Sequence, residues 1–320
     1  MAVVLAAGSG LPAQSATPTP AQIAQPSAIA GSPASPPALP PASPPASALP
    51  SASAILVGPS ASPFPPLAAG VVPILYLHRV VAPPAAWTTW TAARRKAFLA
   101  YNVIPAAFAA DLDWLQANGY TTILPRDLAA HWDRGAPLPR RPVIITLDDG
   151  HPSWVTTVLP MLQARHMVAE FYLTLDAIDR GSISWRQVEA LAKAGMGIGA
   201  HDVDHIQLAG LGPSASPVSP EEMWFQVNEA RLIIGQHIGS PPDSMAYVGG
   251  GFDATLVGLV RKAGYTTARS IIRGIRQPER DRYALRVVAL APMDDVIDPV
   301  LGTIAPGVPT FAAKVTGAAT

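Results

Sequence analysis

The sequence predicts an α/β fold, a distorted (β/α) barrel of about seven parallel strands, preceded by a disordered tether rich in Pro, Ala and Ser. Three observations support this prediction. From residue 71 onward, apolar strand-like runs alternate with helix-like segments, an order typical of a parallel sheet covered by helices. One run, residues 143–147, is apolar or β-branched throughout, as in strands buried on both faces. No charged residue precedes Arg79, and 16 of the 36 prolines lie before residue 71.

Composition divides the chain into four predicted segments. Residues 1–16 resemble the apolar part of a signal segment without the basic residues that should precede it; the alternative is a merely apolar N-terminus. Residues 17–70 are predicted to be a flexible linker, because they hold too few large apolar side chains to offset the entropy of ordering. Residues 71–295 are the expected catalytic domain, and 296–320 a C-terminal tail. A signal-like segment followed by a linker predicts a secreted or cell-surface protein.

Charge and apolar patterning argue against several kinds of partner. The 22 acidic and 22 basic residues balance, which argues against nucleic acid or an acidic membrane, since both attract proteins with a basic excess. The chain has no cysteine, so disulfides and thiolate metal sites are ruled out. No run of 18 apolar residues occurs, so we expect no transmembrane span. We expect a monomer.

The elements expected after residue 70 follow from apolar runs, caps and breakers. Ser184 with Gln187, and Ser219 with Pro220, have the pattern of helix starts, and Asp253 is expected to cap another helix. A polar, proline-rich loop is expected between residues 124 and 143. Strands are predicted at 71–77, 120–124, 143–147, 168–174, 196–200, 244–248, 265–268 and 285–288. Helices are predicted at 105–118, 154–165 with a kink near Pro160, 184–195, 219–237 and 253–264.

Polar side chains follow the predicted central strand directly. Asp148, Asp149 and Gly150 come after residues 143–147, and in α/β folds the carboxyl ends of strands are where ligands bind. Two adjacent carboxylates repel each other, and a bound cation is a common remedy, with one carboxylate as ligand and the other nearby as a base. The alternative is that these residues form only a turn or a helix cap.

A pair of histidines follows another predicted strand, 196–200. His201 and His205 are four residues apart, and in one helical turn both imidazoles would lie on one side. With the Asp149 carboxylate they provide two nitrogens and one oxygen, a set suited to zinc or another divalent first-row metal. A His-x-x-x-His spacing alone is weak evidence, since histidines that cap helices or lie on surfaces are common.

These motifs together resemble the polysaccharide deacetylase family, also called the NodB homology domain or carbohydrate esterase family 4. Ile-Ile-Thr-Leu-Asp-Asp-Gly at 144–150 is similar to the family's Thr-Phe-Asp-Asp-Gly motif, and residues 198–205 resemble its His-Ser/Thr-x-x-His motif. Residues 245–253 resemble the Phe-Ala-Tyr-Pro-Tyr-Gly stretch of one branch, typified by the bacterial poly-N-acetylglucosamine deacetylases. That branch begins with a Tyr-His strand, to which residues 76–79 are similar. The resemblance covers about residues 71–290.

The resemblance implies a role for each matching residue. Asp149, His201 and His205 would hold one divalent metal ion, which we expect to be zinc, with cobalt, nickel or iron as alternatives. Asp148 would be the base that takes a proton from the metal-bound water, and a backbone N–H near Tyr247 would stabilise the oxyanion together with the metal.

The catalytic acid implied by the resemblance is His78. Most family members take this acid from a C-terminal Leu-x-His motif, but no histidine follows His237 here. In the branch with the N-terminal Tyr-His strand the acid comes from that strand, which His78 matches. The alternative is a histidine that is only hydrogen-bonded at a strand end.

Several residues depart from the family pattern. Asp202 replaces the usual Ser or Thr and would add negative charge beside the metal, and Ile206 replaces a proline. Val248 and Gly249 replace Pro-aromatic, which removes a ring from the acetyl pocket. The arginine that flanks the base in many relatives has no clear match; Arg286 could supply its charge or could belong to a surface ion pair.

The function implied is metal-dependent hydrolysis of the acetamide of N-acetylated sugars in a cell-envelope or extracellular polysaccharide. The partner would be an N-acetylated polysaccharide or oligosaccharide. Two alternatives remain open: a catalytically degenerate carbohydrate-binding surface protein on the same scaffold, and a hydrolase of a small cyclic amide or imide.

Overall fold

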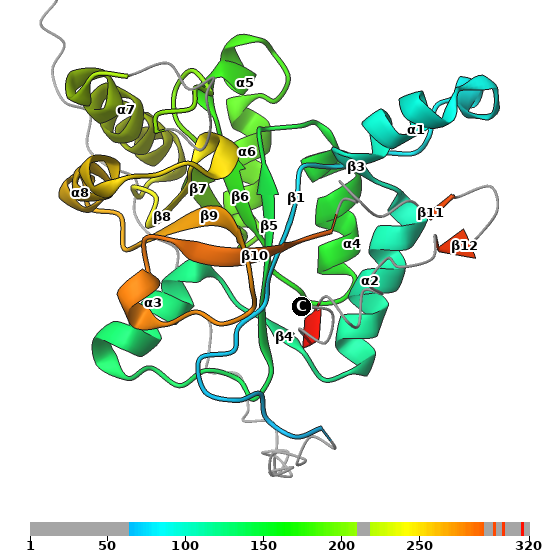
Figure 1. Cartoon of the computed structure of the whole chain (residues 1–320), viewed down its shortest axis with the longest axis horizontal. Helices are drawn as coiled ribbons and strands as arrows, with labels where there is room; N and C mark the ends of the chain where they lie inside the picture. Colours follow the sequence, from blue (N-terminus) through cyan, green and yellow to red (C-terminus); the bar gives the residue numbers. More distant parts are fainter. Residues whose placement is uncertain (1–63, 210–217, 291–296, 299–302, 305–314, 317–320) are drawn as a thin grey trace, which may run out of the picture. The chain divides into compact units, whose positions relative to one another are not determined.

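The chain folds into a closed barrel of seven parallel strands with helices outside it, as the sequence predicts (Figure 1). The computed structural model describes residues 64–209, 218–290, 297–298, 303–304 and 315–316, all within one compact unit, Pro59–Thr320. The barrel strands are β1 (Ile74–Leu77), β5 (Pro142–Asp148), β6 (Glu170–Leu173), β7 (Gly197–Ala200), β8 (Ser244–Ala246), β9 (Thr267–Arg273) and β10 (Leu285–Ala289).

The central strand β5 is buried along its whole length. It pairs in parallel with β1, with Leu77 opposite Leu147, and with β6, with Asp148 opposite Tyr172. The barrel closes because β10 pairs with β1, with Leu75 opposite Val288. Since all seven strands run in the same direction, their carboxyl ends lie at one end of the barrel.

Helices cover the barrel, with α2 and α4 on one side and α7 and α8 on another (Figure 1). Three predicted caps are confirmed: Ser184 and Gln187 form a capping box, Ser219 Oγ accepts a hydrogen bond from the Glu222 amide, and Asp253 Oδ1 accepts one from Leu256. The helices are α1 (Ala92–Leu99), α2 (Pro105–Ala117), α3 (Pro125–Arg134), α4 (Leu159–Gln163), α5 (Leu175–Asp179), α6 (Trp185–Lys193), α7 (Pro220–Ile238) and α8 (Ala254–Ala263).

Helix α3 lies where the sequence analysis expected a loop, and that prediction was wrong. Pro125 occupies the first helical turn, where its missing N–H costs nothing. Asp127 Oδ2 accepts a hydrogen bond from the Leu124 amide at 2.8 Å, and Gly135 ends the helix with a φ of 68°. A proline that starts a helix was therefore interpreted as a loop signal.

The predicted kink near Pro160 takes a specific form. Residues Trp154–Val158 make a π-helical turn, and α4 continues from Leu159. Proline has no N–H for the helical ladder, and wider turns are one way in which a helix accommodates such a break.

Residues 64–70, predicted as the end of the linker, lie against the barrel. The Leu67 amide donates to the Arg140 carbonyl at 3.0 Å, and the Arg141 guanidinium lies over the Phe64 ring. Contacts with the barrel are therefore already present at residues 64–67, before the predicted start of the domain at 71. The predicted signal-like segment and the rest of the linker lie outside the described residues.

Five short strands lie outside the barrel in the described part of the chain. Strand β2 (Arg79–Val80) pairs with β3 (Asn102–Val103), and β4 (Thr121–Thr122) pairs with the start of β5. Within the predicted tail, β11 (Ile297–Asp298) pairs antiparallel with β12 (Thr303–Ile304). Among the described helices, none combines the length and the apolar character needed to cross a membrane.

Candidate active site

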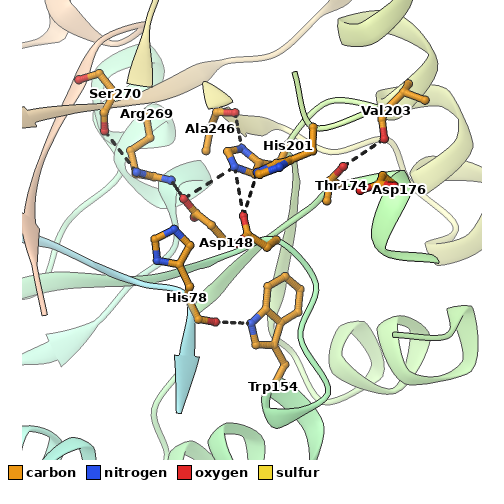
Figure 2. A network of polar contacts seen from close by, with 12 residues as sticks. His78, Asp148, Trp154, Thr174, Asp176, His201, Val203, Ala246, Arg269 and Ser270 are labelled. Atoms are coloured by element: carbon orange, nitrogen blue, oxygen red, sulfur yellow. Dashed lines mark hydrogen bonds and ion pairs between the residues drawn. The ribbon is translucent and has the colours of Figure 1, made fainter. Parts of the chain in front are cut away.

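Five polar side chains meet at the carboxyl ends of the barrel strands (Figure 2). His78 follows β1, Asp148 ends β5 and Asp149 follows it, and His201 follows β7. Arg269 extends from β9 to Asp148. The parallel barrel therefore brings together polar residues that are up to 191 positions apart in the chain, because the carboxyl ends of its strands lie at one end.

The predicted metal ligands do converge. One ligand atom from each of Asp149, His201 and His205 lies within 4.8 Å of the others. Asp149 Oδ1 is 3.6 Å from His201 Nε2 and 3.1 Å from His205 Nε2. This oxygen is buried, and it has no hydrogen-bond partner within the part of the chain that the structure describes. An unsatisfied buried oxygen between two imidazole nitrogens fits a divalent cation.

A backbone carbonyl orients the first histidine. His201 Nδ1 lies 2.8 Å from the Ala246 carbonyl oxygen, which can only accept, so Nδ1 carries the proton and Nε2 is free to bind a metal. Burial lowers the pKa of His201, which favours this neutral form.

The other two ligands differ in charge. Burial alone would raise the pKa of Asp149, but the imidazoles of His205, His201 and His78 outweigh it and hold the pKa well below its usual range. The Asp149 carboxylate in turn raises the pKa of His205. The carboxylate is thus ionised, as metal binding requires.

The segment from His201 to His205 is a loop and not the helical turn that the sequence analysis expected. Asp202 and His205 have φ values of 64° and 54°, and Asp149 has 84°. Non-glycine residues rarely adopt positive φ, and such strain is typical of functional sites. The two imidazoles are brought together by this loop conformation instead of by helical spacing.

Neighbouring elements hold the histidine loop in place. Gln226, fully buried on α7, accepts hydrogen bonds from the amides of Val203 and Asp204 at 3.0 and 2.9 Å. It also donates to Asp204 Oδ2 at 2.6 Å. Thr174 Oγ1 donates to the Val203 carbonyl at 3.1 Å (Figure 2). This network fixes the backbone that carries both imidazoles.

The base candidate Asp148 is paired with a guanidinium that the sequence analysis missed. Arg269 donates a short hydrogen bond to Asp148 Oδ2, and both side chains are buried. The guanidinium lies between the rings of Tyr76 and Tyr172, at 5.0 and 5.2 Å from their centroids.

Arg286 does not occupy that position. Its guanidinium lies 3.5 Å from the Asp281 carboxylate, and both side chains are partly exposed. Arg286 therefore belongs to a surface ion pair, the second of its two predicted roles. The signal for Arg269 was present: it is the first polar residue after the predicted strand 265–268, and that strand in fact continues through it.

The acid candidate His78 faces the same site (Figure 2). Its carbonyl accepts a hydrogen bond from Trp154 Nε1 at 3.0 Å. Its ring makes edge contacts with Tyr76 and Tyr101, at centroid distances of 5.5 and 5.3 Å. Its buried Nδ1 has no hydrogen-bond partner among the described residues, so that nitrogen is not committed to a structural contact.

The backbone N–H of Tyr247 is already used in a hydrogen bond, so it is not available as an oxyanion donor. Its amide donates to the Arg269 carbonyl at 3.0 Å, and its hydroxyl donates to the Tyr283 carbonyl. Because the β8–β9 ladder uses this N–H and the Gly250 amide donates to the Tyr247 carbonyl, an oxyanion donor in this turn would have to be the amide of Val248 or Gly249.

Asp202 does not simply add charge beside the metal ligands. It is buried, and neither carboxylate oxygen has a hydrogen-bond partner among the described residues. Burial raises the pKa of Asp202 to about 8, against the opposing effect of His205. Burial therefore disfavours the negative charge that the sequence analysis expected at this position.

Comparison with known proteins agrees with this geometry. Residues 135–268 match the family model described as polysaccharide deacetylase. YxkH of Bacillus subtilis, a candidate polysaccharide deacetylase, is 23% identical over 186 residues, which is 58% of this chain and 64% of YxkH. The poly-beta-1,6-N-acetyl-D-glucosamine N-deacetylase of Escherichia coli is 36% identical over 63 residues, 20% of this chain and 9% of that protein. The chain thus spans less than two thirds of these curated relatives.

A solved structure supports the fold. The Streptococcus pyogenes deacetylase PplD, determined in complex with acetate, aligns with a TM-score of 0.61 at 17% identity, covering 71% of this chain and 94% of PplD. The family match spans β5 to β9 and includes the Asp148-Asp149 and His201–His205 motifs. The resemblance inferred from these motifs is confirmed by the family match, which covers residues 135–268 of the chain.

Proposed function

We propose that this protein removes acetyl groups from an N-acetylated amino-sugar polymer by hydrolysis, with the help of one divalent metal ion. The observation that carries the proposal is the convergence of two sets of residues at one end of the barrel: the Asp149, His201 and His205 ligand atoms, and the Asp148–Arg269 pair with His78. The first set suits a metal; the second provides a base and an acid.

Asp149, His201 and His205 would hold the metal. Their donor set of one carboxylate oxygen and two imidazole nitrogens is typical of catalytic zinc, and cobalt, nickel and iron accept the same ligands. When bound, the metal would supply Lewis acidity, which activates water and polarises the amide carbonyl.

Asp148 would act as the general base. A carboxylate must be ionised to accept a proton, and burial opposes ionisation. The Arg269 guanidinium, which is also buried, offsets this penalty because its positive charge lies beside Asp148 Oδ2. Asp148 Oδ1 is buried and has no hydrogen-bond partner among the described residues, so this oxygen is free to take the proton of the attacking water.

His78 would act as the general acid. An amide nitrogen is a poor leaving group until it is protonated, so a group on the site must deliver a proton as the C–N bond breaks. His78 borders the site from β1, while His201 and His205 are committed as ligands.

The substrate class follows from the chemistry and the relatives. An acetamide carbonyl needs a base, an acid and an oxyanion donor, and an amide of the turn Val248–Gly250 could fill the last role. An N-acetylated glycan of the cell envelope or extracellular matrix supplies such acetamides. This substrate would place the protein outside the cytoplasm, in line with the apolar N-terminal segment.

A second candidate is a carbohydrate-binding protein that has lost catalysis. Val248 and Gly249 at the third motif are the observation that favours it, because no aromatic ring replaces the one expected there. We favour hydrolysis, since Asp148 with its buried arginine and all three candidate ligands are present.

Acetate release distinguishes the two candidates. The full-length protein would be incubated with acetylated β-1,6- and β-1,4-linked glucosamine oligomers, peptidoglycan and acetylxylan, with and without a chelator. We expect chelator-sensitive acetate release from at least one amino-sugar polymer. Binding to a glycan without acetate release in the presence of added Zn²⁺ would favour the non-catalytic candidate.

The metal is tested separately by elemental analysis. We expect one metal ion per chain, and its loss in His201→Ala and His205→Ala. Gln226→Ala should keep the ligands but loosen the loop, which typically lowers metal affinity about 10- to 100-fold. An unchanged metal content in both histidine variants would contradict the ligand assignment.

A further inference from the structure

An aromatic side chain outside the catalytic set contacts the proposed acid. Tyr101 lies between α1 and β3, and its ring is 5.3 Å from the His78 ring in an edge contact. The side chain is nevertheless 50% exposed. A large apolar ring that borders an active site and keeps half its surface in solvent is positioned to contact a ligand.

The backbone around Tyr101 is fixed, so the exposed ring is held in place. Strands β2 and β3 pair with Arg79 opposite Asn102, which puts Tyr101 beside His78. Asn102 Nδ2 donates to the Phe98 carbonyl at 2.6 Å, and the Tyr101 amide donates to the same carbonyl at 3.3 Å. A ring on an anchored backbone loses little conformational entropy when a ligand binds.

Other exposed apolar side chains in the described part do not share this position. Phe225 and Leu232 lie on α7, and Ile271 lies on β9, with exposures of 46%, 43% and 43%. No ring contact links Phe225 to a residue of the site among the described residues. The contact with His78 therefore sets Tyr101 apart.

We propose that Tyr101 is a sugar-binding platform, which stacks against the sugar unit next to the one being deacetylated. One face of a β-linked pyranose carries axial C–H groups and packs well on a flat aromatic ring, while its hydroxyls remain in water. The platform selects oligosaccharides over monosaccharides, because a single acetylated sugar in the site would not extend to it. This proposal rests on the proposed function.

The test compares substrates of two lengths. Kinetics would be measured with the full-length protein on N-acetylglucosamine and on its pentamer with the linkage that releases acetate fastest. Tyr101→Phe keeps the ring, Tyr101→Leu keeps an apolar contact with His78 but no flat face, and Tyr101→Ala removes both. Phe225→Ala is the matched control, an exposed aromatic on α7.

We expect Tyr101→Leu and Tyr101→Ala to raise KM for the pentamer about tenfold, the loss typical of one aromatic stacking contact, and to leave kcat/KM for the monosaccharide within about twofold. Tyr101→Phe and Phe225→Ala should behave like wild type. Equal losses on both substrates with a displaced alkaline limb of the pH profile would mean that Tyr101 only supports His78. An unchanged KM for the pentamer in both variants would also overturn the proposal.

Failure of the proposed function can be told apart from failure of this inference. If the wild-type protein releases no acetate from any amino sugar, the proposed function fails. Binding of the pentamer is then measured by calorimetry. Weaker binding by Tyr101→Ala than by wild type supports the platform, whereas equal binding or none overturns it.

Discussion

Two buried carboxyl groups on neighbouring strands of the barrel have opposite electrostatic environments. Asp148 ends β5, and Glu170 begins β6, two positions lower in the register, opposite Thr146. Both are buried, with 4% and 5% of their surface exposed. Asp148 is paired with the Arg269 guanidinium, whereas Glu170 Oε1 accepts a hydrogen bond from the Ser244 hydroxyl at 2.5 Å.

The difference shows what burial alone does to a carboxyl group. Burial raises the pKa of Glu170 to about 7, and the Ser244 hydrogen bond only partly opposes this. A carboxyl group at this depth is largely ionised at neutral pH only where a fixed cation stabilises its charged form. The barrel provides such a cation, Arg269, at the carboxyl ends of the strands, where the three proposed metal ligands also lie.

The largest expected effect is on catalysis by Asp148. Asp148→Asn removes the base but keeps the shape and one acceptor for Arg269, so the protein should fold and retain its metal. General bases typically contribute about 100- to 10,000-fold to the rate, and acetate release should fall by that amount. Glu170→Gln is the matched control and should remain active. Similar activity in Asp148→Asn and wild type would contradict the assignment of Asp148 as the general base.

Removal of the guanidinium should affect both stability and activity. Arg269→Met leaves a buried carboxylate without its counter-charge, a change that typically costs about 3–5 kcal/mol. Acetate release should also fall, because Asp148 loses the partner that holds its Oδ2. Urea unfolding and the kinetics of acetate release measure the two effects. Arg286→Met, which breaks only the partly exposed pair with Asp281, should change neither by much.

A smaller effect is expected at Glu170, and its sign depends on pH. The folded-state pKa of about 7 lies above the usual value near 4.5, so Glu170 favours folding below pH 4.5 and loses that contribution as pH rises to about 7. Glu170→Gln should therefore be more stable than wild type at pH 8, by about 1–3 kcal/mol, and not at pH 4.5. Equal slopes of stability against pH in both proteins would contradict the assigned environment of Glu170.

Much of the site could be predicted from the sequence because its residues follow one rule. His78, Asp148 and His201 are the first polar groups after apolar strand-like runs, and a parallel barrel brings such strand ends together. The same rule also indicates Arg269, which directly follows the predicted strand 265–268. That strand in fact continues to Arg273.

Other features depend on contacts between distant residues, which the sequence pattern does not reveal. The conformation of the His201–His205 loop is set by Gln226 on α7 and by positive φ angles, not by local helical propensity. The Tyr247 amide is used by a strand ladder whose register depends on β9. Helix α3 is not predicted because a proline such as Pro125 occurs both in loops and at helix starts. The hydrogen bond from the Leu124 amide to Asp127 Oδ2, which caps this helix, becomes visible only in the structure.

The most direct test of this account is the pH dependence of kcat/KM for acetate release by wild type and His78→Ala. With Asp148 as an ionised base and His78 as a protonated acid, the wild-type rate should rise and then fall with pH. His78→Ala should keep its metal, lose about 100- to 10,000-fold in rate and show no alkaline limb in what remains. A His78→Ala protein within a few-fold of wild type, with the alkaline limb intact, would show that the leaving amine takes its proton from another group.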